Sequence, residues 1–239
     1  MYGLGTLINA AAIVIGGILG LLFGKLITDK IRDMLCKVSG ISVMFIGIAG
    51  AMKGMLTIGE DGKISSGSEM LLVGCLCLGG LVGELIDIEG NLERFGAWLR
   101  KRTGSEGDGG FVDGFLTCTF TICIGAMAIV GSINDALYGD LSILITKAVL
   151  DLIMVMILAA SMGKGPIFSV IPVVILQGSI TLLALLISPI MTELALSNLS
   201  TVGSTLVFCV GVNLVFDKRI RVANLLPAIV FAVVSALIK

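Results

Sequence analysis

Lys147 and Asp151 lie four residues apart in the otherwise apolar segment TKAVLDLIMVMILAASMG. On a helix this spacing puts both side chains on one face. Each charge inside a membrane helix costs about 2.5–3.5 kcal/mol on insertion scales, so such residues usually mark a substrate, ion or proton pathway. We therefore expect the pair to act in coupling or substrate binding. A structural pair that fixes helix packing is the alternative, and Lys147 could also snorkel toward the outer end of its helix.

Further polar residues in apolar segments are candidates for the same pathway. Glu84 lies near the end of Met70–Ile88, where it could bind an ion or be a solvated helix end that faces Arg94. Asp113 precedes the stripe of Thr and Gly residues in GFLTCTFTICIGAMAIVGS, which could border an aqueous path or allow close helix packing. Amides can coordinate a polar solute or cation, although they more often join helices by hydrogen bonds. The amides in apolar segments are Asn9, Gln177, Asn213 and Asn224.

No enzyme motif accompanies these residues. The chain has no histidine, which excludes a Ser–His hydrolase, and it contains neither HExxH nor GxSxG. Nearly all of the six cysteines lie inside apolar runs without the spacing of metal ligands. We expect a protein that is not an enzyme and that has no metal site, disulfide or cofactor.

Composition predicts the class of protein. Apolar residues make up 56% of the 239 residues and charged residues 14%, with a mean hydropathy of +1.10, whereas about 25% of an ordinary soluble domain is charged. Charge-free runs such as Leu4–Gly24 and Gly165–Thr192 exceed the roughly 20 residues that cross a bilayer core. The sequence predicts an all-α polytopic membrane protein, one transmembrane domain over residues 1–239, with the lipid bilayer and no nucleic acid as partner.

Seven to eight transmembrane helices are expected, and the first is too long and lacks the basic leader of a cleavable signal peptide. The eight candidate spans are Gly5–Gly24, Val38–Leu56, Met70–Ile88, Val112–Ser132, Leu141–Met162, Ile167–Ser188, Ser197–Phe216 and Val222–Ile238. Pro172 makes span 6 the best candidate for a discontinuous helix. The connectors Leu26–Lys37 and Asn91–Arg102 combine apolar and basic residues at helical spacing, which is typical of helices at the membrane interface.

Basic residues gather in alternate loops. Because cytoplasmic loops collect Lys and Arg, the loops after spans 1, 3, 5 and 7 are predicted to lie inside and both termini outside, in a bacterial cytoplasmic membrane. The basic residues of these loops are Lys25, Lys30, Arg32, Lys37, Arg94, Arg100, Lys101, Arg102, Lys164, Lys218, Arg219 and Arg221.

A hydrophobic segment, a connector and a second hydrophobic segment recur three times. The copies that begin at Gly16 and Gly79 share GGxxG, and the third copy aligns Ile27 with Met191. With the predicted topology, copies one and two are parallel and copy three is inverted, a construction that recurs in transporters with a site at the midplane. The alternative is that helical hairpins of similar composition resemble one another.

Four stretches resemble one family over nearly the whole chain: GTLINAAAIVIGG, CIGAMAIVGSINDALYGD, TKAVLDLI and GKGPIFSVIPVVILQGSITLLA. This family is the bacterial integral membrane family of domain of unknown function 554. The resemblance implies a polytopic inner-membrane protein, proposed to transport a substrate that is not established. It covers Lys147, Asp151, Gln177 and the NLLPA motif that ends at Ala228, and it implies no catalytic residue.

Three functions remain open at this stage. The first is a secondary transporter or permease for a small solute or ion, with a polar cavity bounded by spans 1, 3, 5 and 6. The second is a channel or passive pore in which the same residues set selectivity. The third is a membrane scaffold that oligomerises through GGxxG, which a dry interior around Lys147 and Asp151 would favour. Because the chain has only about eight helices, a homodimer that completes the pathway is also left open.

Overall fold

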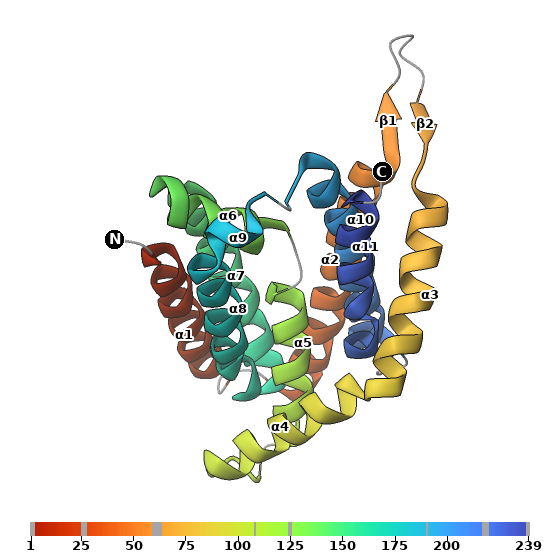
Figure 1. The fold of residues 1–239 in the computed structure, drawn as a ribbon. Helices are drawn as coiled ribbons and strands as arrows, with labels where there is room; N and C mark the ends of the chain where they lie inside the picture. The colour runs from red at the N-terminus through yellow and green to blue at the C-terminus, as the bar shows by residue number, and fades with distance from the viewer. Residues whose placement is uncertain are drawn as a thin grey trace.

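The structure is a computed structural model that describes residues 3–24, 28–58, 64–107, 109–123, 126–189, 191–216 and 220–237. It is a bundle of helices, with one short hairpin of strands beyond an end of the bundle (Figure 1). The hairpin pairs β1 (Leu56–Ile58) with β2 (Ile64–Ser66) in antiparallel register.

The spanning helices confirm the predicted all-α membrane class. Six segments of the described chain are long and apolar enough to cross a bilayer, and a bent pair of helices adds a seventh. A shorter apolar segment, Val222–Leu237, comprises η2 (Val222–Leu225) and α11 (Pro227–Leu237). The six are α1 (Leu4–Gly24), α2 (Asp29–Met55), α3 (Glu69–Ile86), α7 (Ser142–Met162), η1 (Gly165–Ser169) with α8 (Val170–Leu182), and α10 (Glu193–Phe216).

One predicted interfacial helix forms and the other does not. Asp87, with a φ of 53°, separates α3 from α4 (Ile88–Arg102), which crosses one end of the bundle (Figure 1). The prediction that Leu26–Lys37 forms a separate interfacial helix is wrong, because α2 runs unbroken from Asp29. Leu26 itself lies outside the described residues. No Pro interrupts this stretch, and the ion pair of Asp33 with Lys37 supports its exposed first turns.

The chain direction places the predicted inside loops together. In Figure 1, α1, α3, α7 and α10 run toward the end of the bundle at which α4 lies, and α2, α5, α8 and α11 run away from it. We call this end the basic end, because its described loops and α4 carry Arg94, Arg100, Lys101, Arg102, Lys164 and Arg221. Both termini point toward the opposite end. Which end faces the cytoplasm stays a prediction.

Small residues bring α1 and α7 into close, parallel contact. A side chain at Gly16 would collide with the Leu152 carbonyl, and one at Gly20 with the Met156 carbonyl. The GGxxG glycines of this copy therefore pack helices within one chain.

The second GGxxG copy is used in the same way. Gly79 lies against the backbone of Ala228 in α11, and Gly83 lies against the carbonyl of Asn224 in η2. The expectation that GGxxG forms an oligomer interface is therefore wrong, since both copies are covered by helices of the same chain.

α2 and α10 pack against each other in opposite directions. Gly40 lies beside Gly211, and Gly54 lies beside Thr201. The alignment of the first and third copies also pairs the first residues of these two helices. An antiparallel pair is what an inverted copy requires, while the internal repeat itself stays a prediction.

Candidate functional site

The site is built around a break in the fourth predicted span. In place of one helix over Val112–Ser132, the structure has α5 (Phe111–Cys123) and α6 (Ala126–Tyr138), which are bent by 59° relative to each other. Residues 124 and 125 between them, including Gly125 of the predicted polar stripe, lie outside the described residues. A broken helix in a bilayer exposes carbonyl groups that need a donor.

Pro172 does not break span 6, because Gly165–Leu182 is continuous without a sharp bend. The predicted span Ile167–Ser188 is interrupted later, at Leu183, where α8 ends and the short helix α9 (Ala184–Ile187) begins. Pro172 lies at the third position of α8, in the first turn, where proline is better tolerated than in a helix interior.

Lys147 connects α7 to the end of α5. Its Nζ donates to the Ile122 carbonyl at 2.7 Å, and to the Asp151 carboxylate at 2.6 Å (Oδ2) and 2.8 Å (Oδ1). Lys147 is 6% exposed and Asp151 5% exposed. The ammonium therefore neutralises a buried carboxylate and also satisfies a carbonyl at the negative end of a half-helix.

Asn9 brings a third helix to this group. Its Nδ2 donates to Asp151 Oδ2 at 3.0 Å, and the Asn9 residue is fully buried. The close approach of α1 and α7 along Gly16 makes this contact geometrically possible. We call the set Asn9, Lys147, Asp151 and the Ile122 carbonyl the Lys147 network. The spacing predicted the pair of Lys147 with Asp151, whereas only the fold adds Asn9 and the Ile122 carbonyl to it.

Gln177, also predicted, is 1% exposed on α8, and neither its amide nitrogen nor its amide oxygen has a hydrogen-bond partner. Asn213 forms a local brace instead. It donates to the Ile220 carbonyl at 2.6 Å and accepts the Ile220 N–H at 2.9 Å, which holds the chain after α10. For Asn213 the structure thus supports the helix-joining interpretation of an amide.

Glu84 does not lie near the Lys147 network. It is exposed, and its Oε2 accepts a bond from Arg221 Nη1 at 2.8 Å, whereas Arg94 pairs with Asp87 at 3.1 Å. The expectation that Glu84 faces Arg94 is therefore wrong. The bond to Glu84 raises the pKa of the Arg221 guanidinium.

The predicted cavity between spans 1, 3, 5 and 6 does not form either. α3 packs on α11 and η2, while α1, α7 and α8 pack together elsewhere in the bundle (Figure 1). Hydropathy identifies spans but not their neighbours.

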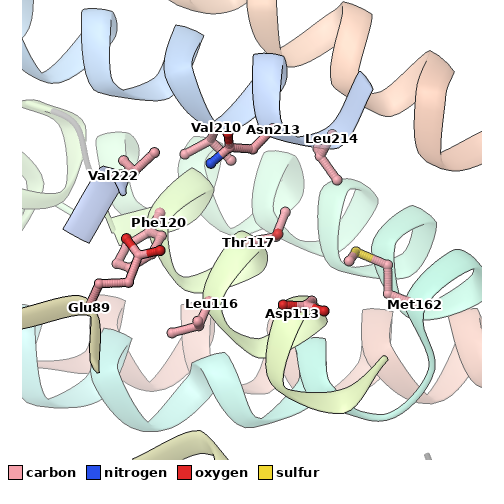
Figure 2. A pocket seen from close by; sticks show the side chains of 10 residues that line it. All are labelled: Glu89, Asp113, Leu116, Thr117, Phe120, Met162, Val210, Asn213, Leu214 and Val222. Carbon is pink, nitrogen blue, oxygen red and sulfur yellow. The ribbon is translucent and has the colours of Figure 1, made fainter. Parts of the chain in front are cut away.

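A cavity of about 280 Å³ lies along α5 (Figure 2). Asp113 and Thr117 of the predicted stripe line it, as does Phe120, two positions before Ile122. Neither Lys147 nor Asp151 lines it. The lining residues are Glu89, Asp113, Leu116, Thr117, Phe120, Met162, Val210, Asn213, Leu214 and Val222.

Two buried carboxylates were not among the predicted site residues. Glu89 of α4 lines the cavity and accepts the Ala223 N–H at 3.1 Å. Asp135 of α6 is fully buried and accepts the Gly5 N–H at 3.0 Å. Each carboxylate accepts its bond from a residue more than a hundred positions away in the sequence. No local sequence pattern therefore indicated that Glu89 and Asp135 are buried.

Metal chemistry has no candidate centre among the described residues, which contain no group of three or more Cys, Asp or Glu side chains placed to hold an ion. The cysteines that the structure describes are free thiols.

Comparisons with known proteins agree with this picture at the level of the family. The family described as Protein of unknown function (DUF554) matches residues 4–237. The chain is 29% identical over 225 residues to the uncharacterized membrane protein YdfK of Bacillus subtilis, covering 94% of this chain and 92% of the relative. It is 30% identical over 236 residues to the uncharacterized protein YqgA of Escherichia coli, covering 96% and 94%. No solved structure matches the chain.

Proposed function

The chain belongs to the DUF554 family of membrane proteins, and on that premise we propose that it is a secondary transporter or permease for a small solute or ion. The observation that carries the proposal is the contact of Lys147 Nζ with the Ile122 carbonyl, because it couples a buried ion pair to a helix break. Half-helix ends near buried charges are the usual construction of transporter sites.

The ion pair can bias the position of α5. While Lys147 is charged and paired with Asp151, its ammonium also holds the last turn of α5. Protonation of Asp151, or binding of a solute to it, would weaken the attraction that keeps Lys147 in this position. The end of α5 would then lose its donor, which favours a different angle between α5 and α6.

The cavity supplies a place for the solute. Its volume of about 280 Å³ is at the small end of ligand pockets, which run from roughly 300 to 1,000 Å³, so it suits a small solute or a partly hydrated ion. Asp113 and Thr117 provide polar contacts, and Phe120, which also lines the cavity, lies two residues before Ile122 on α5.

Flux in proteoliposomes tests this proposal. Vesicles loaded with pyranine, a pH-sensitive dye, are challenged in turn with NaCl, KCl, LiCl, glycine, glutamate and lactate. We expect a saturable pH change with at least one of these solutes, abolished by Asp151→Asn. Asp140→Asn, an exposed carboxylate before α7, is the matched control and should retain flux.

A membrane scaffold is the second candidate, and one observation favours it: Lys147 and Asp151 are buried and do not line the cavity. Under this interpretation the pair fixes α1, α5 and α7 without any flux. Pyranine signals that are equal to those of empty vesicles for all six solutes would support the scaffold against the transporter. Unitary currents in planar bilayers would instead support a channel.

A further inference from the structure

Several buried polar atoms lie without hydrogen-bond partners at the end of the bundle opposite the basic end. They belong to α1, α6 and α8, which contact one another in pairs. The atoms are Thr6 Oγ1, Asn9 Oδ1, Asp135 Oδ1, both amide atoms of Gln177, and Thr181 Oγ1. Buried polar atoms in folded proteins are nearly always hydrogen-bonded to protein or to ordered water, so such a group of atoms indicates a place for water.

The packing of α1 against α8 arranges these residues one after another along the contact between the two helices. The two helices run antiparallel, because Thr181 lies beside Gly3 and Ile167 lies beside Gly17. This register puts Gln177 level with Leu7, between Thr6 and Asn9 on the facing helix. Thr181 and Gln177 are one helical turn apart and share a face of α8.

One turn of α1 joins the two buried acids. Asp135 accepts the N–H of Gly5, and Asp151 accepts the amide of Asn9, four residues further along the same helix. At 1.5 Å per residue the two attachment points are about 6 Å apart along the axis. One or two waters can bridge an offset of that size between polar groups.

We propose that Asp135, Thr6, Gln177 and Asn9 line a narrow hydrated path that delivers protons to Asp151 from the end opposite the basic end. The assignment of the proton as coupling ion rests on the proposed transport function, whereas the hydration of the path does not. A proton that arrives through the waters binds an Asp151 carboxylate oxygen, and the attraction that holds Lys147 on the Ile122 carbonyl weakens. Each water passes one proton on and receives one, so the chain is unchanged after a transfer.

The charged surroundings of the path are simple. Four helices near the path carry ionisable side chains: α6 has Asp135 and Tyr138, α7 has Lys147 and Asp151, α5 has Asp113, Cys118 and Cys123, and α10 has Glu193 and Cys209. The described residues of α1, α8 and α9 (Ala184–Ile187) include none. Lys147 is the one described cation among these groups, and it is already paired with Asp151.

Silver-ion accessibility tests the hydration directly. In a full-length background with all six cysteines replaced by alanine, Thr6→Cys and Gln177→Cys are reconstituted, exposed to Ag⁺, denatured, and titrated for remaining thiol with a maleimide dye. The control is Ile13→Cys, since Ile13 is fully buried one turn beyond Asn9 in an apolar cluster. We expect Ag⁺ to block Thr6→Cys and Gln177→Cys at least tenfold faster than Ile13→Cys. Equal rates at the three positions would overturn the proposal.

Proton flux tests the role of the path. Asp135→Asn should slow the solute-dependent pyranine signal at least tenfold, and Asp140→Asn should leave it unchanged. A normal signal in Asp135→Asn would refute proton delivery by this route. If no solute gives flux but Ag⁺ still enters, the transport function fails and the hydrated path stands, so the two failures are distinguishable.

Discussion

Replacing Lys147 with methionine should be the most disruptive single change in the Lys147 network. Asp151 would keep the Asn9 amide, at 3.0 Å, as its one described donor, and the Ile122 carbonyl would lose the ammonium. The methionine side chain fills a similar volume, so the effect isolates the charge. Its physical basis is that a carboxylate left buried without its counter-ion is poorly solvated.

The magnitude follows from the burial and the distance. The 2.6 Å contact between Nζ and Oδ2 corresponds to about 6 kcal/mol of attraction at an effective dielectric constant of 20. Both side chains are only 7% exposed, so solvent screens them weakly. Removing one partner of a buried pair costs about 3–5 kcal/mol, and we expect Lys147→Met to lose that much unfolding free energy.

The double variant Lys147→Met with Asp151→Leu distinguishes a lost charge from lost packing. Apolar replacements of a buried pair are often neutral or stabilising by about 1–4 kcal/mol, so the double variant should recover most of the loss. On the proposed mechanism it should nevertheless carry no flux, because nothing is left to couple.

Unfolding in mixed micelles with increasing sodium dodecyl sulfate measures these free energies, with the reaction of the buried Cys118 thiol as the readout. Lys101→Met, an exposed position on α4, is the control and should change stability by no more than about 0.5 kcal/mol. The reasoning is refuted if Lys147→Met costs less than about 1 kcal/mol, or if the double variant is as unstable as the single one.

Three further predictions address packing, surface charge and topology. Gly83→Val should cost about 1–3 kcal/mol or more in the same titration, because its side chain meets a backbone carbonyl, whereas Gly178→Val enters open space and should cost little; equal losses would contradict the packing. Arg221→Gln should leave the unfolding midpoint unchanged, since both partners of its ion pair are more than half exposed; a large shift would show that this pair is structural. In intact cells, a cysteine at Gly107 should react with an impermeant maleimide only after permeabilisation, and one at Asp140 without it; the reverse pattern would invert the topology.

Sequence reasoning identified the helices because long apolar runs have few alternatives in a bilayer. It also identified α4, whose amphipathic pattern is local. Sequence reasoning failed where one sequence pattern is compatible with two different structures. The residues around Asp33 and Lys37 suit an interfacial helix as well as the first turns of a long one, and only the absence of a break before Met55 decides between them.

The helix break illustrates a second limit. Pro172 is the conspicuous residue, yet it lies in the first turn of α8, where proline is better tolerated than in a helix interior. The actual break follows Cys123, where the sequence shows only small and apolar residues. Its stabilising partner is Lys147, which lies on another helix and becomes a donor to Ile122 only in the folded bundle. The spacing of Lys147 and Asp151 revealed the ion pair but not its third contact.

One apolar cluster lies between the two polar regions of the bundle, and its position determines what a transport cycle would have to change. The cluster contains Ile13, Ile122, Val155 and Leu214, and Leu214 also lines the cavity. Asn9 lies one turn from Ile13, and Ile122 supplies the carbonyl that Lys147 holds. Water or solute in the cavity therefore meets packed side chains before it can reach Asp151. Under the proposed function a shift of α5 would disturb this layer, because Ile122 belongs both to the cluster and to the last turn that Lys147 anchors. Under the proposed function, protonation of Asp151 and opening of the cluster are thus coupled through a single residue of α5.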